Sequence, residues 1–146
     1  MAARSTQPYA GFEPRVGQVE ALRTFRIGAD GSLYPLYVDS AWSDGENVAR
    51  CRAVRPLDDV ATSSHPDDVP HPNCTCGFYA YANEGEAADN PHARHVLAVV
   101  ATWGRMVAGT RGVRAERAAI EAVWFSAAVP RDLAARVAAR YPGVAV

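Results

Sequence analysis

The sequence HVLAVVATWGRMVA at residues 95–108 continues through GTRG at 109–112 into VRAERAAIEAVWF at 113–125. The first part is rich in valine and carries Trp103, which is typical of a buried β-strand. The glycines at 109 and 112 favour a tight turn after it. The third part is ambiguous, because its alanines and glutamates favour a helix, whereas the preceding turn favours a hairpin partner. We interpret residues 113–125 as the second strand of a hairpin, with a helix as the open alternative.

The sequence outside residues 95–125 completes the pattern of an α+β domain. Its expected elements are strands at 21–27, 33–38 and 47–54, an irregular proline-rich loop at 55–73, and a helix at 130–140. Asp30-Gly31 is a hairpin-turn signal between the first two strands, and Pro130 and Asp132 are typical of a helix start. The expected fold is a mostly antiparallel β-sheet or partly open barrel with a C-terminal amphipathic helix. Residues 1–16 are expected to form a flexible tail, and 17–146 a single globular domain.

Composition narrows the class of protein. The chain has 146 residues, a net charge of −1 and 49% hydrophobic residues, which suits one folded domain. A pI of about 6.4 argues against a nucleic-acid coat or a polybasic membrane binder. All 15 basic residues are arginines, which excludes lysine Schiff-base and P-loop chemistry. The chain has no apolar stretch of the secretory or membrane-spanning type, so we expect a cytoplasmic protein.

Cysteine and histidine are concentrated in one short segment, HPNCTC at 71–76. Thiolates and a neutral imidazole suit tetrahedral zinc, and Cys51 can complete a set with His71, Cys74 and Cys76. A metal at this point would fix the proline-rich loop to a strand. The spacing Cys-x-Cys is not that of a standard zinc finger, and His65 competes with His71 as the fourth ligand. Three buried reduced thiols are the alternative.

Arginines gather around the predicted hairpin beside Trp103. Guanidinium groups bind carboxylates and phosphates in bidentate fashion, and an indole ring offers a stacking surface. The residues Trp103, Arg105, Arg111 and Arg114 are therefore candidates for binding an anionic ligand or an acidic partner. A solvated face balanced by glutamates is the competing interpretation.

A catalytic site is the alternative for the cysteine segment. Cys74 and His71, with Asp67 or Asp68, have the residue types of a nucleophilic triad. These residues crowd one loop, however, whereas catalytic residues usually converge from separate elements. The sequence contains no P-loop, Rossmann glycine set, nucleophile elbow, HExxH or zinc-deaminase pattern. An enzyme is therefore the second hypothesis.

Three segments together carry a resemblance to a known family: HPNCTCGFYAY at 71–81, WGRMVAGTRGVRAERAAIEAVW at 103–124 and LAARVAARYPGVAV at 133–146. In these the chain resembles a family of small, uncharacterised actinobacterial proteins. That family carries a Pro-His-Pro-x-Cys-x-Cys-Gly-aromatic-Tyr-Ala segment, a Trp-Gly-Arg strand and a Gly-x-Arg-Ala segment. The N-terminal hairpin and Cys51 also fit, so the resemblance covers most of residues 17–146. It implies that His71 and the three cysteines belong to one pattern, and it implies no activity.

These observations lead to one favoured hypothesis. We expect a small cytoplasmic, zinc-stapled, β-rich module that binds an unidentified protein or a small anionic ligand. A small enzyme that uses Cys74 and His71 is the alternative.

Overall fold

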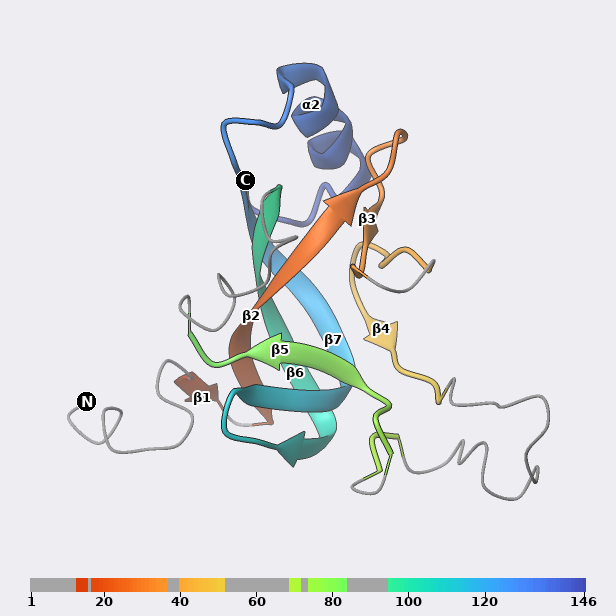
Figure 1. Ribbon diagram of the computed structural model, residues 1–146, viewed down its shortest axis with the longest axis vertical. Helices are drawn as coiled ribbons and strands as arrows, with labels where there is room; N and C mark the ends of the chain where they lie inside the picture. The colour runs from red at the N-terminus through yellow and green to blue at the C-terminus, as the bar shows by residue number, and fades with distance from the viewer. Residues whose placement is uncertain (1–12, 16, 37–39, 52–68, 72–73, 84–94) are drawn as a thin grey trace.

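The computed structural model describes residues 13–15, 17–36, 40–51, 69–71, 74–83 and 95–146. The strands pair in an antiparallel sheet, and one helix among the described residues follows near the C-terminus (Figure 1). The elements are β1 (Glu13–Arg15), β2 (Gln18–Ile27), β3 (Leu33–Tyr34), β4 (Asn47–Val48), β5 (Phe78–Tyr81), β6 (Val96–Ala108), β7 (Gly112–Phe125) and α2 (Arg131–Arg140). The mostly antiparallel sheet with a C-terminal helix is therefore confirmed.

The long hairpin of β6 and β7 is the centre of this sheet. The two strands pair from Val96↔Phe125 to Ala108↔Val113, and the Gly109 N–H donates to the Gly112 carbonyl at the turn. The interpretation of residues 113–125 as a strand is thus confirmed. Pairing on both sides explains why the alanines and glutamates of this segment do not form a helix: β7 also pairs with β5 and β4.

The sheet curves into a partial ring. Strand β6 pairs with β2 and β7, β7 pairs with β5, and β5 returns to β2 through the single pair Leu22↔Tyr81. Register shifts between Val99 and Val100, and between Trp103 and Met106, interrupt the β6–β7 ladder. Such bulges bend strands, and Figure 1 shows β5 crossing in front of the curved hairpin. Because a single residue pair joins β5 to β2, the ring is not a full barrel. Of the two expected forms, a mostly antiparallel sheet or a partly open barrel, the structure shows the sheet.

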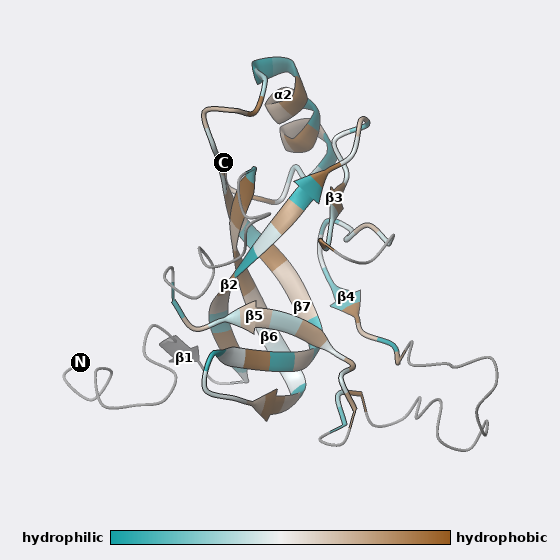
Figure 2. Ribbon diagram, viewed as in Figure 1, coloured by the Kyte–Doolittle hydropathy of each residue, from teal (hydrophilic) through white to brown (hydrophobic). Residues whose placement is uncertain are grey.

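Hydrophobic side chains fill the inside of this curved sheet. Along β7, Val113 and Ala115 are buried while the residues between and beside them are less so, as period-2 alternation requires. Figure 2 shows the same alternation of hydrophobic and hydrophilic residues along the front part of the hairpin. The core includes the side chains of Phe25, Leu33, Trp42, Val96, Val100, Ile120, Val123, Val137 and Tyr141.

Helix α2 closes one end of the sheet, as predicted from Pro130 and the apolar spacing. Val137 is buried, and Tyr141 just after the helix is only 2% exposed. Its hydroxyl accepts a hydrogen bond from the Leu33 N–H at 2.8 Å and donates one to the Trp42 carbonyl at 2.6 Å. Tyr141 thereby joins the helix to the segment around β3.

The remaining strands are shorter or differently placed than the pattern predicts. Strand β1 lies inside the segment 1–16, the expected tail, and pairs with β2. Strand β3 ends at Tyr34 because Pro35 has no N–H to donate. Strand β4 covers two residues, so Cys51 lies beyond it in irregular chain. Most of the proline-rich loop, residues 55–68 and 72–73, lies outside the described residues, as do residues 52–54 of the expected strand 47–54. No helix in the described part of the chain is long and apolar enough to cross a membrane.

Candidate metal centre

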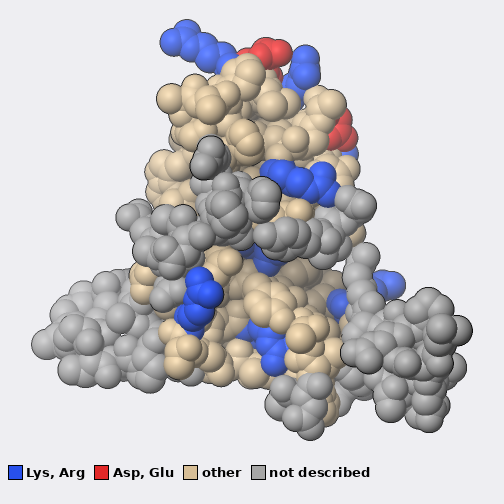
Figure 3. Space-filling model, in the orientation of Figure 1, with Lys and Arg blue, Asp and Glu red and all other residues tan. Residues whose placement is uncertain are grey.

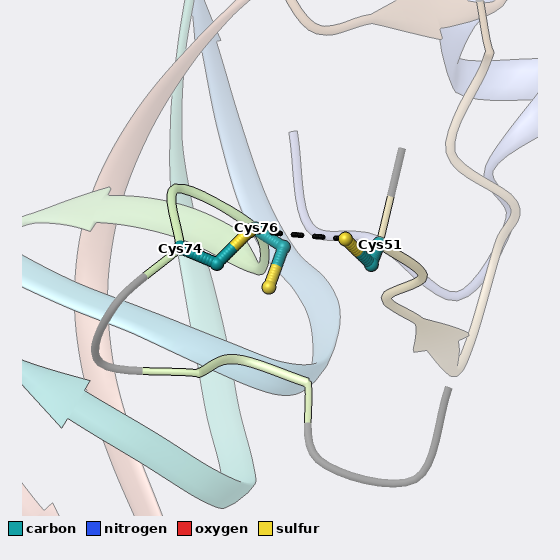
Figure 4. Close-up of side chains that lie close together, drawn as sticks. All are labelled: Cys51, Cys74 and Cys76. Atoms are coloured by element: carbon teal, nitrogen blue, oxygen red, sulfur yellow. Dashed lines mark hydrogen bonds between the residues drawn. The ribbon is translucent and has the colours of Figure 1, made fainter. Parts of the chain in front are cut away.

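Three cysteine side chains meet from two separate segments. Cys51 follows β4, whereas Cys74 and Cys76 belong to the loop that leads into β5 (Figure 4). Their sulfur atoms all lie within 4.8 Å of one another, and the Sγ atoms of Cys51 and Cys74 are 3.8 Å apart. None of the three forms a disulfide, which would need a separation of about 2.05 Å. The arrangement is compatible with a metal site.

The distance between two of the sulfurs is the distance expected between two ligands of a tetrahedral zinc ion. Two thiolates that each lie about 2.3 Å from a tetrahedral zinc are about 3.8 Å from each other. The distance between the sulfurs of Cys51 and Cys74 equals this edge. The cluster also joins residues 23 positions apart in the chain, so an ion bound there would close a long loop.

Glycine and buried neighbours shape the loop that carries two of the cysteines. Gly77 has a φ of +110°, a conformation that other residues rarely adopt. A Cβ at this position would lie 2.9 Å from Pro70 Cβ and 3.3 Å from the Ala115 carbonyl oxygen. Val69 and Pro70 are themselves buried against this turn. The Cys-x-Cys-Gly sequence therefore produces a turn that is packed tightly against β7.

Arg114 on β7 also binds this loop. Its Nη1 donates hydrogen bonds to the carbonyl oxygens of His71, Cys74 and Cys76. Its guanidinium also lies 5.9 Å from the centre of the Tyr79 ring. A single cation thus satisfies three carbonyl groups that no strand or helix uses.

The protonation of the cluster depends on burial. Burial raises the pKa of the Cys76 thiol, and the neighbouring sulfurs of Cys74 and Cys51 raise it further. A hydrogen bond from the His71 backbone N–H to the Cys76 sulfur acts in the opposite direction. Without a cation, three thiolates so close together repel one another. A bound divalent ion reverses this preference, because it stabilises the deprotonated form of its ligands.

The backbone of His71 contacts this cluster, but its imidazole is not in it. Among the described residues, the group of ligand atoms within 4.8 Å of one another comprises the three sulfurs. The His71 carbonyl accepts hydrogen bonds from the Cys74 N–H and from Arg114. His65, the competing fourth ligand, lies outside the described residues, as do Asp67 and Asp68 of the alternative catalytic site.

The structure does not bring the four predicted ligand-binding residues of the hairpin together. Arg111 and Arg114 line one cavity of about 300 Å³ with Tyr79 and Tyr81. Trp103 and Arg105 are not among its lining residues. Trp103 lies opposite Arg117 on β7, and the Arg105 N–H donates to a carboxylate oxygen of Glu116 at a bulge.

A second cavity, of about 270 Å³, adjoins the cysteine loop. It lies among β2, β4 and the start of β5, and Cys76 forms part of its wall together with Arg23, Trp42, Phe78 and Arg50. The sequence analysis did not select Arg23. The available signal was its position between Ala21 and Phe25 on β2, where alternation points a charged side chain toward the core.

Neither a protein-family model nor a curated protein nor a solved structure matches this chain.

Proposed function

We propose that this chain is a zinc-stapled binding module, in which one structural Zn²⁺ is held by the thiolates of Cys51, Cys74 and Cys76. The observation that carries the proposal is the meeting of all three cysteines of the chain, from two segments, with their sulfurs within 4.8 Å of one another and those of Cys51 and Cys74 at the edge length of a zinc tetrahedron. Sulfur-rich sites of this kind prefer zinc over harder cations.

His71 is the favoured fourth ligand. Its backbone already contacts the cluster through the hydrogen bond to the Cys76 sulfur, so this residue is placed beside the three sulfurs. His65 is the alternative. The site would be closed and structural with either histidine, which agrees with a role in stability rather than in catalysis.

The composition of the cluster favours this proposal over the small enzyme. A catalytic thiolate needs a lowered pKa and an electropositive, accessible setting. Here the imidazole of His71, the base of the alternative site, lies outside the described group of three sulfurs, and the cation on the loop, Arg114, donates to carbonyl oxygens. The module would bind its partner or a small anionic ligand through surfaces near the zinc site.

Metal analysis of untagged protein, purified without chelator from zinc-containing medium, tests the proposal. We expect one equivalent of zinc per chain in the wild type and well under one in Cys74→Ser. Thr75→Ser is the matched control, because Thr75 lies exposed between the two loop cysteines and should keep the full equivalent. His71→Ala and His65→Ala, compared with His95→Ala, identify the fourth ligand. Wild-type protein with no zinc, and with thiols that react at once without chelator, would contradict the proposal.

A further inference from the structure

The cavity beside the cysteine loop has a cation in its wall. Arg23 is on β2, and its guanidinium carbon lies 5.0 Å from the centre of the Trp42 ring and 5.5 Å from that of Phe25. Its Nη1 donates to the Tyr79 carbonyl, but its buried Nε has no hydrogen-bond partner among the described residues. A buried donor nitrogen without a partner is costly unless a ligand completes its hydrogen bonds.

No acidic side chain among the described lining residues balances this cation. None of the described residues that line the cavity is an aspartate or a glutamate, and the second charged residue of the lining is Arg50 at its exposed edge. Burial lowers the pKa of Arg23 to about 10, which still leaves it charged at neutral pH. On the face shown in Figure 3, the described charged residues over the lower half of the sheet are basic, whereas acidic ones appear only near the helix end. The cavity therefore attracts anions.

Part of the remaining wall is apolar, beside the polar residues Ser40, Asn47 and Thr75. Trp42 and Phe78 meet edge to face with ring centres 4.7 Å apart, and Pro35 and Val48 add aliphatic surface. A volume of about 270 Å³ is at the small end of ligand pockets. A ligand of one ring and one acidic group fits this combination.

We infer that this cavity binds a small aromatic carboxylate, with its carboxylate on the Arg23 guanidinium and its ring against Trp42 and Phe78. The inference rests on the proposed function in one respect, that the domain is a binding module. It does not need the zinc ion, because Arg23 and Trp42 belong to the sheet and the core.

Calorimetric titration with benzoate tests this inference, with benzamide as the neutral isostere and acetate as the anion without a ring. We expect benzoate to bind the wild type at least about tenfold more tightly than either, as a charge-assisted pair in an aromatic pocket requires. Arg23→Met should remove the preference for benzoate over benzamide. Arg26→Met, on the same strand but outside the cavity lining, should keep it.

A second variant covers the case in which Arg23→Met does not fold. Val48 is 50% exposed and lines the cavity, so Val48→Trp should fill the cavity and block benzoate without disturbing the core. Val146→Trp, at an exposed position away from the cavity, is its control. No binding of benzoate by the wild type, equal binding of benzoate and benzamide, or unchanged binding in Val48→Trp would each overturn the inference. Zinc content measured on the same samples keeps a failure of the zinc proposal separate from a failure of ligand binding.

Discussion

Arg114 donates a hydrogen bond to the carbonyl oxygen of Cys74, across 40 positions of sequence. The same guanidinium nitrogen reaches the carbonyls of His71 and Cys76, so three carbonyl groups of the cysteine loop bind this one side chain. A metal ion held by this loop would depend on Arg114 without touching it, as metal sites commonly depend on the groups that orient their ligands.

Arg114→Gln should therefore weaken zinc binding. Loss of an orienting contact of this kind typically costs about 10- to 100-fold in metal affinity. Competition with a chromogenic chelator measures the affinity of the folded protein. Arg117→Gln is the matched control, because Arg117 is on the same strand and its ion pair with Glu46 is exposed and lies apart from the cysteine loop. Equal zinc affinities in the two variants would show that Arg114 does not position the ligands.

Gly77→Ala should disrupt the cysteine loop by two separate effects. The positive φ of Gly77 would strain alanine by about 1–2 kcal/mol, and the new methyl group would press on Pro70 at 2.9 Å. Gly45→Ala isolates the first effect, because Gly45 has a φ of +90° and no atom within 4 Å of an added Cβ. We expect urea unfolding to show a larger loss of stability for Gly77→Ala, together with loss of zinc. Equal losses in the two variants would mean that the loop moves aside freely.

The sequence was most informative where one segment folds against its neighbour. The β6–β7 hairpin follows from the valine-rich run, the glycine turn and the segment after it. The choice between helix and strand for 113–125 was less certain, because alanine and glutamate favour a helix locally. Pairing with β6, β5 and β4 overrides that preference, and such long-range pairing is not visible in local composition.

The site shows the same division between local and long-range information. Cys74 and Cys76 are neighbours in sequence, so their joint role could be predicted, and the inclusion of Cys51 was correct as a guess about long-range contact. The sequence could not show that Arg114 binds the carbonyl groups of the cysteine loop, because that contact depends on the register between β5 and β7. It could have marked Arg23, whose position between Ala21 and Phe25 puts a charge on an apolar face.

Cys74→Ser should lower the melting temperature far more than Thr75→Ser does. Binding and folding are linked at such a site, because the thiolate set exists only in the folded chain. The apolar core around Phe25 and Tyr141 remains when the ion is lost, so we expect a lower transition rather than complete unfolding. Differential scanning calorimetry with and without a strong chelator measures both effects. A melting temperature that neither chelator nor Cys74→Ser changes would identify the cysteines as packed thiols.

Tyr141 should make the fold sensitive to alkaline pH. Burial is the main cause that raises the pKa of its hydroxyl, and the donated hydrogen bond to the Trp42 carbonyl also needs the proton. Because the folded state holds this proton more tightly than the unfolded state, the contribution of Tyr141 is fully present below the ordinary tyrosine pKa of about 10. It is lost as pH rises through the higher folded pKa.

Tyr141→Phe should cost about 1–3 kcal/mol at neutral pH, since the Leu33 N–H and the Trp42 carbonyl lose their partner. The difference in unfolding free energy between wild type and Tyr141→Phe, measured by urea titration from pH 7 to 11, should therefore shrink above pH 10. Tyr79→Phe, at an exposed ring, provides the comparison. A difference that stays constant across this range would show that the Tyr141 proton does not stabilise the fold.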